Sequence, residues 1–210
     1  MKALKIWAFV MAVISVLIVI TSCILVNDND ETETETATET ETNVETIKEM
    51  ATTATKAIKE KIKFFEGFSP KAIWDNGAYA YGYGHHDETL TKDSTITRAE
   101  AEVLFEQDIV LFETVVIQFA SEHHLVFNQT EFDALVCFLY NLGENYFQII
   151  AEKFIEDNRY VLVNYLIYGE YTEEEMIEEW TSYCHEDGEF RQALYDRRMF
   201  EVKLFLYGEY

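Results

Sequence analysis

The sequence predicts an α+β domain that is mainly helical and has one small β-hairpin near its start. Apolar residues recur every three or four positions over most of the chain from residue 45 onward, which is the period of amphipathic helices. A single Gly- and Tyr-rich stretch, residues 74–86, alternates instead. The chain has 210 residues, 49% of them hydrophobic, which suffices for one such domain at 45–210 preceded by segments at 1–26 and 27–44.

Residues 1–26 combine a short basic start with a long uncharged apolar run. Lys2 and Lys5 precede the run, which continues to Val26 and so approaches membrane-spanning length. Within it, "ITSC" resembles a bacterial lipobox, which predicts cleavage and a lipid anchor on Cys23. An uncleaved signal anchor and ordinary secretion are the alternatives. All three export the rest of the chain and leave the basic end in the cytoplasm.

Residues 27–44 alternate acidic residues with threonine. This period of two has no apolar partner, so the segment is not a half-buried strand. Like charges repel each other and nothing in the segment can be buried. The composition therefore predicts an extended, disordered tether between the membrane and the folded domain.

The folded domain is expected to open with a helix over residues 46–66. Thr46 and Glu49 match a capping box, and Gly67 is a plausible helix stop. A hairpin should follow, because Asn76-Gly77 is a strong turn signal and "AYAYGYG" alternates after it.

The remainder of the chain is predicted to be helical. Thr97 and Glu100 form a second capping box that opens a helix carrying an apolar stripe. Further helices are expected near residues 131–142, 151–166, 173–183 and 192–206.

The charge and the cysteines limit the classes of function. The formal net charge of −23 argues against nucleic-acid binding, which requires Lys and Arg to neutralise phosphates. No paired-cysteine metal motif is present, and we expect neither a metal site nor a cofactor. Cys137 and Cys184 could pair in an exported domain, although Cys137 lies in what looks like a buried helix, where free cysteine is common.

Two carboxylates stand at the ends of predicted elements. Glu66 lies where the first helix ends and Asp75, nine residues later, lies at the turn of the hairpin. A helix end followed by a hairpin would bring both side chains to one cleft wall. Two such groups are the minimal equipment for glycoside hydrolysis, one as a protonated acid and one as an ionised base.

The motifs around this pair resemble those of the phage-type lysozymes, the family of T-even phage lysozymes and lambdoid endolysins. "FFEGF" and "WDNGAYAYGYGHH" resemble the family's Glu-Gly helix end, its aspartate and its hairpin closing in I-G-Y-G-H. "ITRAEAEVLFEQDI", "FNQTEFDALVCFLYNLG" and "RRMFEVKLFLYGEY" are similar to three later helices of the family, in family order. The resemblance implies a lysozyme-like fold in which the hairpin sheet forms one wall of the active-site cleft.

Carried over by position, Glu66 is the general acid and Asp75 activates the attacking water. The family has a threonine six residues after the aspartate that helps to hold this water, and Tyr81 stands at that spacing here. The resemblance also makes Asn141, Tyr83 and His85 candidate substrate contacts. Arg197 and Arg198 are expected to be structural ion partners.

The resulting expectation is an exported, membrane-tethered, monomeric muramidase. It would cleave the β-1,4 bond between N-acetylmuramic acid and N-acetylglucosamine in peptidoglycan strands. Because a tyrosine is much larger than a threonine, the alternative is a peptidoglycan-binding protein that has lost turnover.

Overall fold

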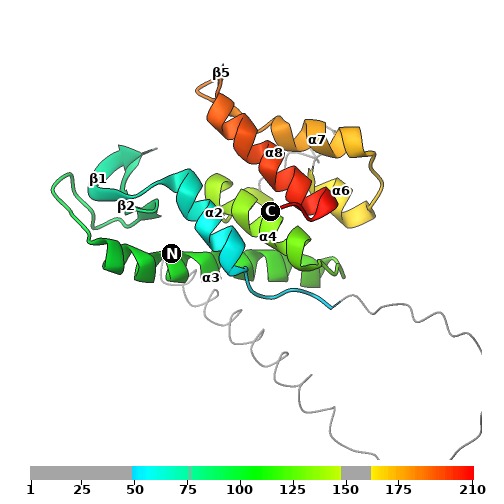
Figure 1. The fold of residues 1–210 in the computed structure, drawn as a ribbon, viewed down its shortest axis with the longest axis horizontal. Coiled ribbons are helices and arrows are strands. Elements are labelled where there is room, and N and C mark those ends of the chain that lie inside the picture. The colour runs from blue at the N-terminus through cyan, green and yellow to red at the C-terminus, as the bar shows by residue number, and fades with distance from the viewer. Residues whose placement is uncertain (1–48, 76, 148–161) are drawn as a thin grey trace, which may run out of the picture. The chain divides into compact units, whose positions relative to one another are not determined.

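The computed structural model describes residues 49–75, 77–147 and 162–210 (Figure 1). Helices dominate, and the sheets are small and antiparallel, as the sequence predicts. The elements in chain order are α2 (Lys56–Glu66), β1 (Ser69–Asp75), β2 (Ala78–Gly82), β3 (His85–His86), α3 (Arg98–Glu122), α4 (Gln129–Leu142), α6 (Leu162–Tyr168), α7 (Glu173–Thr181), β4 (His185–Glu186), β5 (Glu189–Phe190) and α8 (Gln192–Tyr207).

Helix α4 is the centre of the core. Its residues 132–139 are all buried, and it packs against α2, α3 and α8 (Figure 1). Such a helix is apolar on every side because other helices surround it. Asn128 and Glu131 form a capping box at its start, so the helix begins slightly earlier than the apolar pattern alone predicts.

The first helix begins later than predicted. It starts at Lys56 with Thr55 as N-cap, and the described residues 49–55 are not helical. Backbone N–H groups in this segment donate hydrogen bonds to residues distant in the chain. Ala51 donates to the carbonyl of Phe127 at 3.0 Å, and Ala54 donates to Glu113 Oε1 at 2.7 Å. These bonds hold the segment extended against α3 and the loop before α4. The expected capping box at Thr46 lies outside the described residues.

The hairpin is present and belongs to a three-stranded sheet of order β1-β2-β3. Its register pairs Asp75 with Ala78 and Ile73 with Ala80. Asn76 of the predicted Asn76-Gly77 turn lies outside the described residues. Strands β2 and β3 both contact α3, whose predicted capping box at Thr97 and Glu100 is formed.

A second, two-stranded sheet, β4-β5, was not predicted. Its turn contains Asp187 and Gly188 at φ 51° and 79°, the left-handed backbone that an Asp-Gly pair favours. The Asp-Gly dipeptide is the sequence feature from which this turn could have been predicted. The predicted helices at 173–183 and 192–206 correspond to α7 and α8, whereas the one at 151–166 lies mostly outside the described residues.

No helix in the described ranges is long and apolar enough to cross a membrane. The segments 1–26 and 27–44, including Cys23, are not among the residues that the structure describes. The two cysteines that it does describe, Cys137 and Cys184, are both buried free thiols and form no disulfide with each other.

Candidate active site

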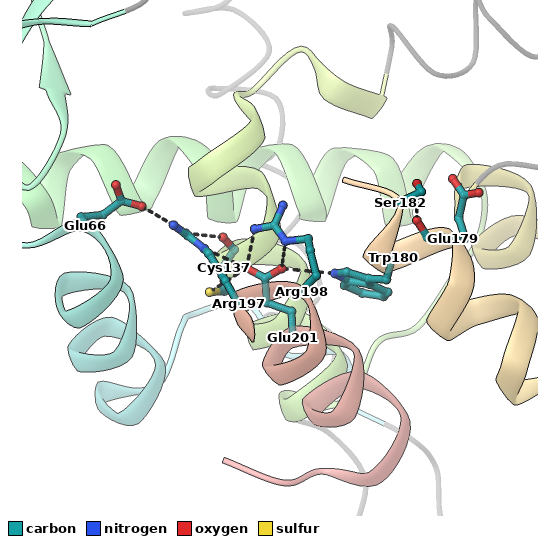
Figure 2. Close-up of polar contacts among 8 residues, drawn as sticks. All are labelled: Glu66, Cys137, Glu179, Trp180, Ser182, Arg197, Arg198 and Glu201. Atoms are coloured by element: carbon teal, nitrogen blue, oxygen red, sulfur yellow. Dashed lines mark hydrogen bonds and ion pairs between the residues drawn. The ribbon is translucent and has the colours of Figure 1, made fainter. Parts of the chain in front are cut away.

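Glu66 is the last residue of α2 and is largely buried, with 19% of its side chain exposed. Gly67 ends the helix because it adopts φ +67°, a conformation that suits glycine. Glu66 Oε1 accepts a hydrogen bond from Arg197 Nη1 at 2.6 Å (Figure 2). The other oxygen, Oε2, lies beside the β2–β3 turn, where a Cβ on Gly84 would be 3.6 Å from it. The hairpin and the helix end therefore meet at this carboxylate.

Arg197 belongs to a buried charge cluster between α4, α7 and α8 (Figure 2). Its Nε contacts Glu201 Oε1 at 3.1 Å, and its Nη2 donates to the Cys137 carbonyl at 3.1 Å. Arg198 Nε lies 2.7 Å from Glu201 Oε2, which also accepts from Trp180 Nε1 at 3.2 Å. Two arginines thus balance the carboxylates of Glu201 and Glu66.

The cluster makes Arg197 and Arg198 structural ion partners, as expected. The contact of Arg197 with Glu66 could not be predicted from the sequence, because Glu66 lies 131 residues earlier in the chain. Although burial opposes it, the carboxylates of Glu201 and Glu66 help to raise the pKa of Arg197, so the guanidinium stays charged.

Asp75 stands at the end of β1, with 62% of its side chain exposed. Its Oδ2 lies 3.5 Å from Nε2 of His86, the last residue of β3. The exposed carboxylate is open to water.

Strand register decides which side chains share the face of Asp75. Successive residues of a strand point to opposite faces, and directly paired residues point to the same one. The pairs Asp75–Ala78, Ile73–Ala80 and Ala80–His86 therefore lie on one face. Tyr81 pairs with His85 and lies on the other face.

The predicted role of Tyr81 beside the catalytic water is thus not supported by the geometry. Its half-buried ring packs against the core, and its centroid lies 5.9 Å from that of His85. The strand residue beside Tyr81 on the face of Asp75 is Ala80, which has no hydroxyl group. Counting positions from the aspartate missed this, because one residue of offset in a strand reverses the face.

Tyr83 and His85 both have structural partners, and their predicted contact with substrate stays a prediction. The buried Tyr83 donates to Glu102 Oε1 at 2.7 Å and accepts from Arg98 Nη1 at 2.9 Å. His85 Nδ1 lies 3.0 Å from Asp108 of α3. Burial raises the pKa of Asp108, and the adjacent His85 opposes this rise.

Asn141 lies partly buried in the last turn of α4, and its predicted contact with substrate stays a prediction. An open depression of about 450 Å³ lies near the α2 helix end; neither Glu66 nor Asp75 lines it. Its lining residues are Glu60, Lys63, Phe64, Phe68, Tyr83, Arg98 and Glu102. In the described ranges, no three His, Cys, Asp or Glu residues are arranged to hold a metal ion.

Comparison with known proteins identifies the family. The family model described as phage lysozyme matches residues 63–201, which include Glu66, Asp75 and the Arg197 cluster. The chain belongs to the phage lysozyme family. Membership makes it a glycoside hydrolase of the lysozyme type. No curated protein matches the chain in sequence.

Solved structures with the same fold include a muramidase domain and two phage endolysins. The muramidase domain of SpmX from Asticaccaulis excentricus is 25% identical, with a TM-score of 0.57 over 74% of this chain and 99% of that one. An endolysin from Escherichia coli O157:H7 phage FAHEc1 is 24% identical, with a TM-score of 0.55 over 74% and 94%. The active form of the P1 phage endolysin Lyz is 18% identical, with a TM-score of 0.56 over 74% and 85%. The lysozyme-like fold is therefore confirmed.

Proposed function

We propose that this phage lysozyme family member is an exported, membrane-tethered muramidase. It cleaves the β-1,4 bond between N-acetylmuramic acid and N-acetylglucosamine in peptidoglycan, with Glu66 as general acid and Asp75 as the base that activates water. The observation that carries the proposal is the setting of Glu66: a buried arginine holds one of its oxygens, and the hairpin that bears Asp75 passes beside the other.

The Arg197 contact assigns different tasks to the two oxygens of Glu66. Oε1 accepts from the guanidinium, so the transferable proton belongs on Oε2, on the side of Gly84. Glycine at position 84 leaves space there for the glycosidic oxygen. When that oxygen takes the proton, the bond from C1 to it breaks and Glu66 becomes a carboxylate. The fixed positive charge of Arg197 stabilises this carboxylate as it forms.

Asp75 completes the reaction from the hairpin. A water attacks C1 from the face opposite the departing oxygen and gives a proton to Asp75. One displacement of this kind inverts the configuration at C1, and it requires two carboxylates far enough apart to admit the water. The exposure of Asp75 suits this role, because water reaches it freely.

Export and tethering rest on the N-terminal sequence. The lipobox-like "ITSC" would place a lipid on Cys23, and the acidic segment 27–44 would let the catalytic domain reach the wall from the membrane. A clickable fatty acid fed to expressing cells should label the wild-type chain and not Cys23→Ala. A wild-type chain that carries no label and keeps its full-length mass would favour the signal anchor.

The catalytic proposal is tested by the release of reducing ends from purified peptidoglycan by the full chain. Glu66→Gln keeps the shape and removes the proton, and we expect turnover to fall by about 10²–10⁴-fold. Asp75→Asn should lose activity on a similar scale. The control is Glu209→Gln, an exposed glutamate near the C-terminus, which should match the wild type. Equal release by Glu66→Gln and the wild type would refute the assignment of the acid.

A binding protein without turnover is the second candidate. The observation behind it is that Ala78 and Ala80, the β2 residues paired with β1 on the face of Asp75, carry no hydroxyl that could hold a water. Sedimentation of the wild-type chain with peptidoglycan, without any new reducing ends, would establish this alternative.

A further inference from the structure

The side chain of His86 makes a polar contact with Asp75 within the three-stranded sheet. Its Nε2 lies 3.5 Å from Asp75 Oδ2, and its pairing with Ala80 puts both side chains on one face. The paired strand residues around them on this face are Ile73, Ala78 and Ala80. None of these three can hydrogen-bond through its side chain.

The spacing of the two atoms suits a shared water. At 3.5 Å they are too far apart for a strong direct hydrogen bond, which spans about 2.7–3.2 Å. One water can lie about 2.8 Å from each of them, so a single water can contact both side chains. With 44% of the His86 side chain and 62% of the Asp75 side chain exposed, solvent reaches both.

The neighbouring histidine fixes the strand that carries His86. His85 points to the other face of β3, where Asp108 of α3 holds its Nδ1 at 3.0 Å. The ring of Tyr81 packs beside His85 on that face, with centroids 5.9 Å apart. Because β3 is only two residues long, this anchor also fixes the backbone of His86.

We propose that His86 positions the attacking water against Asp75, the task that the family resemblance assigns to a threonine hydroxyl. This inference rests on the proposed muramidase function. The water oxygen accepts a hydrogen bond from His86 Nε2–H and forms the new bond to C1. One of its protons passes to Asp75 Oδ2, and His86 keeps its own proton throughout.

The kinetic test uses the full chain and separates turnover from binding. We expect His86→Ala to lower kcat by at least about tenfold while KM stays within about twofold, because a group that orients the water acts on the chemical step. His86→Gln should recover most of the loss, because its amide can donate near the position of Nε2. The matched control is His185→Ala, an exposed histidine on β4, which should equal the wild type.

Two kinetic results would overturn the inference. One is an unchanged kcat in His86→Ala. The other is an equal loss in His86→Ala and His86→Gln, which would indicate that only the ring's packing matters.

A spectroscopic test does not depend on activity. The chain has five histidines, so ring-labelled histidine gives few resonances to assign. Asp75→Asn should shift the ring resonances of His86 and leave those of His185 in place. An unchanged His86 signal would refute the contact even if the wild type is an active muramidase. A wild type without turnover that shows the shift would refute the proposed function and leave the contact standing.

Discussion

The contact between Glu66 and Arg197 shows how a single buried arginine can serve both stability and catalysis. The side chain of Arg197 is 4% exposed and is shared between Glu66 and Glu201. Removing one partner from such a set leaves an uncompensated charge in a poorly solvated place.

We expect Arg197→Met to lower the free energy of unfolding by about 3–5 kcal/mol, since it leaves Glu66 without its cation. Chemical denaturation measures this loss. Arg191→Met is the control, because Arg191 pairs with Glu186 and Glu189 on the surface and should contribute less than about 1 kcal/mol. A loss below 1 kcal/mol in Arg197→Met would show that the cluster contributes little net stability.

A hydroxyl at position 80 should be able to position the attacking water in place of His86. A hydroxyl at position 81 should not. Ala80 shares the face of Asp75 and Tyr81 does not. We therefore expect Ala80→Thr to restore part of the kcat lost in His86→Ala. Tyr81→Thr should give no gain and should cost about 2 kcal/mol of stability, because its ring packs on the core. A faster Tyr81→Thr enzyme in the reducing-end assay would show that the phenol obstructs the water.

Among the elements, α3 has the clearest local signature. Thr97 accepts from the backbone N–H of Glu100, and Glu100 Oε2 accepts from the backbone N–H of Thr97 at 2.9 Å. Thr97→Ala should cost about 1 kcal/mol in thermal or chemical unfolding. Thr114→Ala in the same helix is the control, because Thr114 only bonds back to the Val110 carbonyl and alanine is the better helix former. Equal effects of the two substitutions would contradict a specific role of the cap.

The contact between α2 and α3 predicts a pH dependence of stability. Glu102 accepts from Lys63 Nζ at 2.7 Å and from the Tyr83 hydroxyl at 2.7 Å, and these bonds lower its pKa, that of Lys63 foremost. The folded state therefore favours the ionised form. The stabilisation is present above the pKa of an unfolded glutamate, about 4.3, and is lost as pH falls through the folded pKa.

Glu102→Gln should accordingly be less stable than the wild type at pH 7, by about 0.5–1 kcal/mol because the group is partly exposed. Denaturation curves of the two proteins should converge as the pH falls below 4. Glu122→Gln, at the exposed end of α3, should show no such convergence. A difference between Glu102→Gln and the wild type that does not change with pH would contradict the role of the charge.

On the scale of the whole molecule, both ends of the described fold meet at Asp133 in α4. This buried carboxylate accepts from the backbone N–H of Thr55 at 3.1 Å and from the hydroxyl of Tyr210 at 2.6 Å. The contact attaches the residues just before α2 to the centre of the core.

Tyr210→Phe should lower the free energy of unfolding by about 1 kcal/mol, because it removes a hydrogen bond to a carboxylate from a half-exposed donor. Tyr207→Phe, at a similarly exposed tyrosine, should have no measurable effect on the unfolding midpoint. Equal stability of Tyr210→Phe and the wild type would mean that the C-terminus contributes nothing to holding Asp133.

The sequence by itself determined the helical fold class, the cap at Thr97 and the hairpin of β1 and β2. These features depend on interactions between residues close in the chain, or on motifs whose spacing is preserved. Only the tertiary structure decided that Arg197 reaches Glu66, that Tyr81 faces away from Asp75 and that residues 49–55 are extended. The physical reason is that strand register and the burial of paired charges are set by packing between distant segments, which no local pattern encodes.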